Sequence, residues 1–507
     1  MVSSRADVGG PRAQPVMGLP GLERLVRIRP ETWHGLSDFL TELELRPERV
    51  APLIEVAEAV PEVLRVPLLH YRLRRAPGGL PLVLRLLCFG DRVELRELSS
   101  AFGHERLDWL KRTGLVEFEG ENAHSPFEIG LLGSRFILAD PHLHPGDVVM
   151  GAWRATGSLL KLAFPSSPVG RALDLGCGAG ALALGLSSVA ERVVMTDIYP
   201  RAVEFGRINL ALNHVSNVEA RVGDLYEPVA GETFDLIVCQ PPFVSAPPDD
   251  VVTYLHGGSR GDELERRILE GLVQHLAPQG RALLYLQLPN DRASKLLETV
   301  RGLIGPRATV LLIEDGTLDL DEYCAVHEAP ALMNGYDEYA SRVQRRREHL
   351  DRMGISTIAT AYLVVVNQQP AFTQAYQASG LVWGNGSNAD VEALLAGLAL
   401  AHRSEQELLS SKISFRGEPS IIEIEDGVRI ECPPLMPLHW ERERFGLLHA
   451  ATRASTVAEL RKDLELGDER AQELARELAD VVREAARTGL VVPRALSASV
   501  EHDVEHD

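Results

Sequence analysis

Seven short runs of apolar and β-branched residues, separated by segments long enough for helices, occupy the middle of this chain. Strands that alternate with helices predict βαβ units and a mostly parallel sheet. The runs are almost continuous in Val, Ile and Leu, which is typical of strands buried on both faces. They begin at Ala172, Val193, Val218, Phe234, Ala282, Val310 and Ala361.

Length and composition limit the rest of the chain. Its 507 residues suggest roughly three domains of about 150 residues each. Hydrophobic residues make up 45% and charged residues 24%, which excludes a largely disordered or fibrous chain. We expect no membrane span and no signal peptide. The five scattered cysteines argue against a disulfide framework and a metal site, and favour a cytoplasmic location.

A glycine-rich stretch, LDLGCGAG at 173–180, directly follows the first run and precedes a helical segment. Glycines at alternate positions let the backbone turn tightly and approach a ligand closely. The spacing differs from the GxGxxG of dinucleotide-binding proteins. Asp174 within this stretch would repel a phosphate, so the stretch suits a ligand with a cationic group.

Two more acidic residues stand at the ends of the next runs. Asp197 lies 23 residues after Asp174, and an acid at this position can accept hydrogen bonds from both ribose hydroxyls. The alternative role for Asp197 is to cap the helix that begins near Pro200. Asp224 follows the third run, and its alternative role is that of an ordinary turn residue.

The fourth run ends in Gln240-Pro241-Pro242-Phe243. Two prolines fix the backbone and remove N–H donors, which leaves carbonyl groups that can only accept. The Gln240 amide oxygen and a proline carbonyl could accept hydrogens from a substrate NH₂ group and so orient its nitrogen. The Phe243 ring could stack on a planar substrate.

These four features, in this order, resemble the class I S-adenosylmethionine-dependent methyltransferases that carry a Pro-Pro-Phe/Tyr motif. That group includes release-factor glutamine methyltransferases and ribosomal RNA guanine-N2 methyltransferases. The resemblance covers about 145–367. It implies an α/β fold with a Rossmann-like seven-stranded core, and S-adenosyl-L-methionine as cofactor.

The resemblance also implies cofactor contacts. Asp174 would face the methionine ammonium beside the glycine loop, Asp197 the ribose and Asp224 the adenine amino group. The predicted cofactor-binding set is Asp174, Gly176, Gly178, Asp197, Ile198, Asp224, Leu225 and Gln240.

The predicted catalytic set is Gln240, Pro241, Phe243 and His256. Related enzymes have Asn or Asp where this chain has Gln240, so the longer side chain would shift the acceptor atom. His256 precedes a Gly-Gly-x-x-Gly turn and could accept a proton near neutral pH. Its alternative role is that of a water-exposed loop histidine.

Two further segments flank these motifs. Trp153 and Arg154 precede the first run, where the related enzymes close over the cofactor; the alternative is a packed tryptophan and a surface arginine. A polar insertion at about 316–356 either caps the substrate side or forms a solvated helix. Its arginines, with acids among them, favour a solvated and partly self-paired helix.

The flanking regions complete a five-part division. We predict disordered tails at 1–25 and 498–507, an N-terminal winged-helix-like domain at 26–145, a methyltransferase domain at 146–367 and a C-terminal α+β accessory domain at 368–497. Gly114 stands where a helix C-cap favours a left-handed residue. The stretch RTGLV occurs at both 112–116 and 487–491, which is a second winged-helix-like module or a coincidence.

The leading hypothesis is a methyltransferase that methylates a nitrogen of an amine or amide in a peptide or small specialised metabolite of a biosynthetic route. The net charge of −20, from 52 basic and 72 acidic residues, disfavours RNA. The alternatives are an rRNA guanine-N2 methyltransferase and a non-catalytic winged-helix regulator that binds the same cofactor. A homodimer is compatible with the sequence.

Overall fold

The described part of the chain begins within the predicted N-terminal tail. The computed structural model describes residues 21–494, apart from 57–61, 143, 145–146, 248–254, 291–295, 382–383, 455 and 457–467. Most of the two predicted tails therefore lies outside the described residues. Leu22 and Leu25 are buried at the short helix α1 (Glu23–Val26). Residues 22–25 thus belong to the folded N-terminal region, because these leucines contribute to its core.

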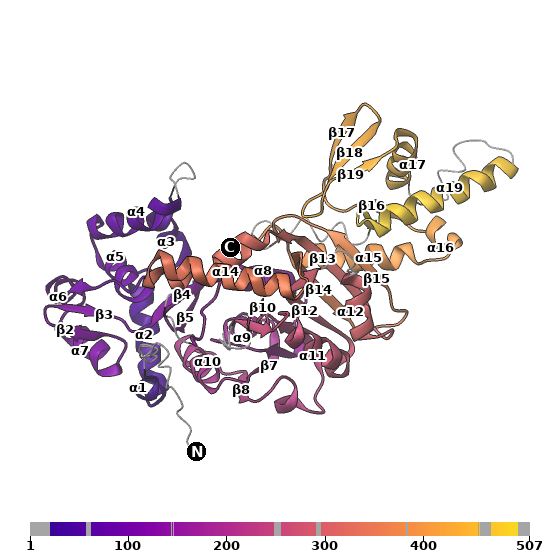
Figure 1. Cartoon of the computed structure of the whole chain (residues 1–507). Coiled ribbons are helices and arrows are strands. Elements are labelled where there is room, and N and C mark those ends of the chain that lie inside the picture. Colours follow the sequence, from indigo (N-terminus) through magenta and orange to yellow (C-terminus); the bar gives the residue numbers. More distant parts are fainter. Residues whose placement is uncertain are drawn as a thin grey trace, which may run out of the picture.

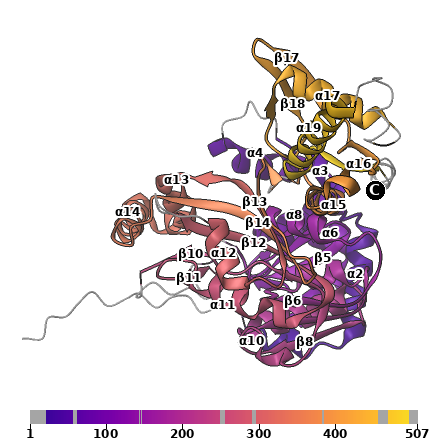
Figure 2. The ribbon, with the colours of Figure 1, turned by 90° about the vertical axis from the view of Figure 1, so that its right-hand side faces the viewer.

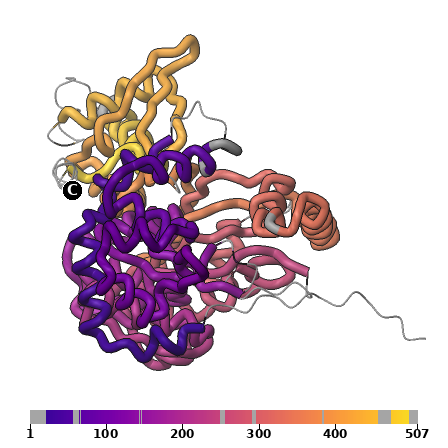
Figure 3. The backbone as a smooth tube through the Cα atoms, turned by 90° about the vertical axis from the view of Figure 1, so that its left-hand side faces the viewer, coloured from indigo at the N-terminus to yellow at the C-terminus, as the bar shows by residue number. Residues whose placement is uncertain are grey.

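The N-terminal region is mainly helical and packs against the central sheet domain (Figures 1 and 3). Helix α2 contacts helix α10 of the central domain. The elements after α1 are α2 (Pro30–Glu42), α3 (Pro47–Ile54), α4 (Glu62–Arg75), α5 (Gly79–Val83), the π-helical turn η1 (Leu84–Cys88), β1 (Val93–Glu94), α6 (Leu95–Phe102), α7 (His104–Thr113), β2 (Glu117–Glu119), β3 (Asn122–His124), β4 (Glu128–Leu132) and β5 (Arg135–Ala139).

Within this region α6, α7 and β2 follow one another in the order that the residues predict. Helix α7 ends at Gly114, whose φ of 83° is left-handed, as expected for a glycine C-cap. Strands β1, β3 and β2 form a small antiparallel sheet. The winged-helix class of this region remains a prediction.

The central domain is an α/β fold built on one large mixed sheet. All seven predicted runs are strands of this sheet, in the order β15-β13-β14-β12-β9-β6-β7-β8. Strands β6, β7, β8, β9 and β12 are parallel, and β14 runs antiparallel between β12 and β13. The bounds are β6 (Val169–Leu175), β7 (Ala190–Asp197), β8 (Val218–Val222), β9 (Phe234–Cys239), β12 (Leu276–Asn290), β13 (Thr309–Leu318), β14 (Thr357–Val366) and β15 (Thr373–Gln377).

The predicted number of seven strands is wrong, because β15 adds an eighth. It pairs in parallel with β13 at the edge of the sheet. Its sequence, TQAYQ, is polar because an edge strand is less completely covered than a central one. Since β15 lies beyond residue 367, the sheet also extends into the range assigned to the C-terminal domain.

Helices cover both faces of the sheet. One face packs against α8 (Arg154–Ala163), α9 (Ala181–Leu186) and α10 (Pro200–Leu212). The other packs against α11 (Glu263–Leu272) and α12 (Leu296–Ile304). The strands between these layers are buried on both sides, which explains their continuous apolar runs.

The polar insertion forms a helical arm between β13 and β14 (Figure 2). It contains α13 (Leu320–His327), the 3₁₀ turn η4 (Ala329–Asn334) and α14 (Tyr336–Arg352). The arm packs on the short parallel strands β10 (Val244–Ser245) and β11 (His256–Gly258), which follow the Pro-Pro-Phe motif.

The C-terminal region is α+β and has its own apolar core. Helix α15 contacts α8 and so joins this region to the central domain. Its elements are α15 (Asn388–Ala401), α16 (Glu405–Leu409), β16 (Ile413–Phe415), β17 (Ser420–Ile424), β18 (Gly427–Glu431), β19 (Leu438–Trp440), α17 (Arg442–Arg453), α19 (Asp468–Arg487) and β20 (Val491–Pro493). Among the described residues no helix has the length and apolar character needed to cross a membrane.

Candidate functional site

The glycine loop follows β6 and is shaped by left-handed glycines. Gly176, Gly178 and Gly180 have φ values of 76°, 50° and 79°. A Cβ at Gly176 would meet no atom within 4 Å, so the space beside this residue is open. At Gly180 close packing favours glycine, because a Cβ there would lie 3.2 Å from the Cα of Gly206. The loop therefore exposes backbone at its start and packs tightly at its end.

Asp174 lies beneath this loop and is fully buried. Its Oδ2 accepts a hydrogen bond from the Ala183 N–H at 2.9 Å, whereas Oδ1 is buried and has no hydrogen-bond partner within the described residues. Burial raises the pKa of Asp174 to about 7, and the charge of Asp197 adds to this shift. A carboxyl group in this state would gain a favourable partner if a cationic ligand group lay beside the loop.

Asp197 ends β7 and links the second strand to the glycine loop. One carboxylate oxygen accepts the Gly178 N–H and the other the Tyr199 N–H, both at 2.9 Å. Tyr199 is the N-cap residue of α10, and Asp197 lies two residues before it. Burial raises the pKa of Asp197. A carboxylate has about four acceptor positions, so the predicted ribose contact is compatible with these bonds.

The ends of β7 and β8 also carry two apolar side chains. Ile198 is 57% exposed although it is strongly apolar. Leu225 has a φ of 47°, a region that non-glycine residues rarely occupy. Asp224, next to it, pairs with Arg267 at 2.6 Å. The strand ends are neighbours because Asp197 pairs with Val222 in the sheet register.

The Pro-Pro-Phe motif begins beside the glycine loop. Leu175, the last residue of β6, pairs in register with Cys239, the last residue of β9. Gly176 and Gln240 therefore leave adjacent strands at the same level. This is the point where the strand order reverses, with β7 on one side of β6 and β9 on the other, and ligands of open α/β sheets bind at such points.

Gln240 reaches across to helix α8. Its Oε1 accepts a hydrogen bond from the Thr156 hydroxyl at 3.0 Å. The same hydroxyl oxygen accepts the Trp153 N–H at 3.3 Å, at the start of α8. The extra methylene of Gln240 thus coincides with a contact to the segment predicted to close over the cofactor.

Trp153 and Arg154, at that helix start, are exposed. Trp153 is 54% exposed and meets the ring of His142 edge-on, with ring centroids 6.0 Å apart. The alternative of a packed tryptophan is therefore wrong. Its exposure leaves the ring accessible at the mouth of the candidate site.

The glycine-rich turn after His256 lies directly against the Pro-Pro-Phe backbone. A Cβ at Gly257 would lie 2.8 Å from the Pro242 carbonyl oxygen, and one at Gly261 would lie 2.5 Å from the Phe243 carbonyl oxygen. Glycine is required at both positions because a side chain would displace the motif. His256 itself is half-buried and pairs with Val244 in the β10–β11 ladder, so the fold places it beside the motif.

Residues of the helical arm form hydrogen bonds with Ser245, which follows Phe243 and Val244. The Ser245 N–H donates to the Tyr323 hydroxyl at 3.2 Å, and the Ser245 carbonyl accepts from Arg346 at 2.5 Å. Arg346 is 2% exposed and forms an ion pair with the equally buried Glu328. The prediction of a solvated helix is therefore wrong for Arg346, whose guanidinium is buried between the arm and the motif.

His327 of the arm lies close to the Phe243 ring, with a centroid separation of 6.4 Å. Burial lowers the pKa of His327 to about 3, with contributions from Arg346 and His256. His327 is therefore a neutral imidazole at neutral pH. The sequence offered no signal for this contact, because His327 lies 84 residues from Phe243 in an insertion.

Glu265 is a second residue that the sequence did not single out. It is fully buried in α11, where its Oε1 accepts the Gln287 N–H at 3.2 Å and its Oε2 has no hydrogen-bond partner in the described chain. The pairing of β12 with β9 stops at Leu284 and Cys239. Beyond this point Glu265 accepts a hydrogen bond from a β12 N–H that has no partner on β9. Burial raises the pKa of Glu265 well above its usual value. No group of three or more metal-ligating side chains occurs within the described residues.

Comparisons with known proteins match this same part of the chain. The model of the methyltransferase small domain family matches residues 154–299. The ribosomal RNA small subunit methyltransferase C of Idiomarina loihiensis is 38% identical over 114 residues, which are 22% of this chain and 30% of that protein. The release factor glutamine methyltransferase of Aliivibrio fischeri is 41% identical over 75 residues, which are 14% and 26% of the two chains. That of Cereibacter sphaeroides is 33% identical over 201 residues, 36% of this chain and 67% of the relative.

The chain thus spans less than a third of the first two relatives and two thirds of the third. The matched segment contains the glycine loop, both acidic strand ends and the Pro-Pro-Phe motif. The open glycine backbone and the buried carboxyl group of Asp174 fit the cationic methionine part of S-adenosylmethionine. The chain therefore belongs to the class I S-adenosylmethionine-dependent methyltransferases, and S-adenosylmethionine is its cofactor.

Proposed function

We propose that this protein transfers a methyl group to a nitrogen of an amine or amide in a peptide or a small specialised metabolite. The observation that carries the proposal is the register of β6 and β9, which starts the glycine loop and the Gln240-Pro-Pro-Phe motif from paired residues. A cofactor on the loop and an acceptor on the motif would then meet at one strand switch point.

The cofactor end of the site is built from the strand ends. Gly176 and Gly178 leave room for the ligand, and ionised Asp174 balances the methionine ammonium. Asp197 accepts from the ribose hydroxyls while it holds Gly178 in place. Ile198 provides an accessible apolar surface for the adenine ring. When bound, S-adenosylmethionine supplies a methyl group activated by its sulfonium charge.

The acceptor end is built from the motif and its supports. The Gln240 amide oxygen and the Pro241 carbonyl accept hydrogens from the substrate nitrogen, which orients its lone pair. Phe243 packs against the substrate, and the arm holds Ser245 so that the motif keeps its shape. Positioning of this kind supplies most of the rate enhancement in such transfers. In this proposal His256, whose backbone pairs with Val244 after the motif, takes the proton that the nitrogen releases.

The choice of a peptide or small molecule over RNA rests on charge. The chain carries a net charge of −20. Three of the five arginines of the arm pair with acids: Arg342 and Arg346 with Glu328, and Arg347 with Asp321 and Asp351. Arg345 and Arg352 are exposed. A ribosomal RNA guanine is the second candidate acceptor, favoured by the similarity to the Idiomarina loihiensis enzyme.

Transfer of tritium from methyl-labelled S-adenosylmethionine to fractions of a cell extract tests the proposal. We expect label in a peptide or small-molecule fraction that resists ribonuclease. Label that ribonuclease removes would establish the RNA alternative. Absence of label from every fraction, with S-adenosylhomocysteine binding intact, would overturn the hypothesis of an enzyme. It would favour the alternative of a non-catalytic regulator that binds the cofactor.

The flanking regions have no chemistry of their own in this proposal. We infer that residues 26–145 form a winged-helix-like accessory module. The part of 368–497 that follows β15 forms a second accessory domain, and either could shape the substrate site or support a homodimer. All five cysteines are free thiols, which supports the proposed cytoplasmic location.

A further inference from the structure

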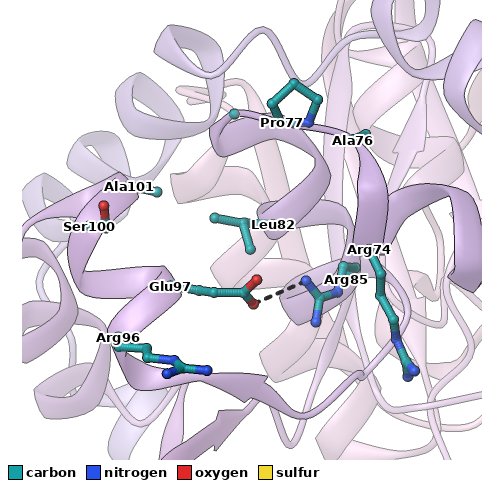
Figure 4. Close-up of a pocket in the computed structure, with 10 residues that line it drawn as sticks. Arg74, Ala76, Pro77, Leu82, Arg85, Arg96, Glu97, Ser100 and Ala101 are labelled. Carbon is teal, nitrogen blue, oxygen red and sulfur yellow. Dashed lines mark hydrogen bonds and ion pairs between the residues drawn. The ribbon is translucent and has the colours of Figure 1, made fainter.

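A pocket of about 580 Å³ lies in the N-terminal region, where the turn between α4 and α5 faces α6 (Figure 4). It is built from elements that precede the central sheet and is separate from the strand switch point. Pro77, Leu82 and Ala101 provide apolar surface along its walls. Its volume lies within the range of about 300–1,000 Å³ that is usual for small-molecule sites.

Three arginines line this pocket, although the chain as a whole is acidic. Arg74 comes from the end of α4, Arg85 from the π-helical turn η1 and Arg96 from α6. Glu97 is the one acidic side chain among the lining residues. Turns of π-helix often mark functional sites, and η1 is the element that carries Arg85 into the pocket.

Arg85 is held between two acidic side chains, Glu97 in the pocket and Asp91 behind it. Its guanidinium is almost fully buried, and Nη1 donates to Glu97 Oε2 at 3.2 Å (Figure 4). Its Nε lies 3.5 Å from Asp91 Oδ2 and makes no hydrogen bond within the described residues. The other Asp91 oxygen is held by His70 at 2.9 Å. The Asp91 side chain is largely buried, like that of Arg85, whereas the Glu97 side chain is 43% exposed. A ligand anion that displaces the Glu97 carboxylate would therefore meet a buried guanidinium that is already held in place.

The two outer arginines differ in how they are held. Arg74 is exposed and has no ion-pair partner in the described part of the chain. Arg96 pairs with Glu94 at the start of α6, and its side chain is 85% exposed. Both can turn toward a ligand at the pocket mouth without breaking a buried contact.

We propose that this pocket binds a small phosphate monoester with a compact apolar body. A phosphate monoester carries close to two negative charges at neutral pH, and guanidinium groups bind its oxygens in paired hydrogen bonds. Arg74 and Arg96 hold the phosphate at the mouth, Arg85 donates from below, and the apolar body packs on Leu82 and Pro77. Glu97 competes with the phosphate for Arg85.

Calorimetric titration of the full chain with phenyl phosphate tests the site. We expect saturable binding with one ligand per chain, at least tenfold tighter than that of inorganic phosphate. Phenol, which lacks the charged group, should not compete. Absence of saturable binding, or equal affinities for phenyl phosphate and inorganic phosphate, would overturn the proposal.

Three variants separate this site from general charge attraction. Arg74→Gln should weaken binding of phenyl phosphate about tenfold, and Glu97→Gln should strengthen it several-fold by removing the competing carboxylate. Arg75→Gln is the matched control, because Arg75 ends the same helix but contacts Tyr71 and does not line the pocket. Equal losses in R74Q and R75Q, or weaker binding in E97Q, would refute the assignment. All three positions are exposed, so the variants should fold.

Discussion

Gln240 and Thr156 show how one methylene group can change the anchoring of a motif. The related enzymes carry Asn or Asp at this position, and the longer Gln240 side chain spans to the hydroxyl of Thr156 on α8. The amide oxygen therefore lies where the Pro-Pro-Phe motif meets the start of helix α8. Sequence alone could mark the departure at Gln240 but could not supply its partner 84 residues earlier.

Replacement of Gln240 by Asn tests this contact. We expect the rate of methyl transfer to fall by roughly a hundredfold, because the acceptor oxygen is displaced by about one bond length. Affinity for S-adenosylhomocysteine should fall less than the rate, because Gln240 is one of eight residues predicted to bind the cofactor. Thr156→Val removes the same hydrogen bond from the other side and should reproduce part of the loss. Unchanged turnover of Q240N on the substrate identified by tritium labelling would show that the extra methylene has no role in positioning.

The buried carboxyl group of Asp174 predicts a pH-dependent stability. Its pKa of about 7 lies above that of the unfolded chain, so the neutral form stabilises the fold and this contribution is lost as pH rises through 7. The free energy of unfolding should fall by about 1 kcal/mol between pH 6 and pH 8 from this group. Denaturant titration of the ligand-free protein at both pH values measures the change.

Asp174→Asn is the variant that isolates this carboxyl group. Glu265 has a raised pKa and contributes with the same sign, whereas His327 has a lowered pKa and contributes with the opposite sign. The fall in the free energy of unfolding between pH 6 and pH 8 should therefore be smaller in D174N by about 1 kcal/mol. A pH dependence identical to that of the wild type would rule out Asp174 as its source.

At the scale of elements, the helical arm is the clearest case of structure that sequence could not foresee. Five arginines spaced along a polar helix indicate a solvated surface. The fold instead buries Arg346 against Glu328 and directs it to the Ser245 carbonyl. The sequence also contained no indication that Glu265 is buried, because a glutamate in an amphipathic helix is normally exposed.

Arg346→Met should therefore destabilise the fold by about 3 kcal/mol. It removes the buried partner of Glu328, which keeps the more exposed Arg342, and it leaves the Ser245 carbonyl without this donor. Arg347→Met is the control, since Arg347 lies one residue away and pairs with acids at the surface. It should cost less than about 1 kcal/mol. Denaturant midpoints provide the comparison. Similar losses of stability in the two variants would contradict a stabilising role for the buried Arg346–Glu328 ion pair.

The strands that are buried on both faces could be predicted, because burial makes their sequences uniformly apolar. All seven apolar runs are strands because they lie inside the sheet, with helices on both faces. Strand β15 was missed because its alternating polar sequence at the sheet edge resembles a loop. The register that brings Gly176 beside Gln240 depends on pairing between strands more than 60 residues apart, which local patterns do not specify.

At the scale of the whole molecule, helix α10 joins the N-terminal region to the central domain. Asn209 of this helix accepts from the Leu138 N–H and donates to the Leu138 carbonyl, both at 2.8 Å. It also donates to the Ala179 carbonyl of the glycine loop at 2.9 Å. A single buried amide therefore connects the N-terminal region to the cofactor end of the site.

Asn209→Ala should weaken both stability and cofactor binding. The change leaves several buried backbone groups unpaired, at about 1–3 kcal/mol each. We expect a lower melting temperature and a reduced affinity for S-adenosylhomocysteine in calorimetry. Asn217→Ala is the control, because Asn217 also donates to two carbonyls but contacts neither the β4–β5 hairpin nor the glycine loop. Equal effects on affinity would show that the amide connection to the loop is unimportant.

The arm between β13 and β14 has a consequence for how such enzymes diversify. The two strands pair from Thr309 with Val366 to Leu318 with Ile358, so the ends of the inserted segment are fixed by a closed ladder. Lengthening a segment between fixed ends adds little conformational cost. The segment can thus change in length without disturbing the ladder, whereas its bonds to Ser245 tie the arm of this chain to the residues after the Pro-Pro-Phe motif.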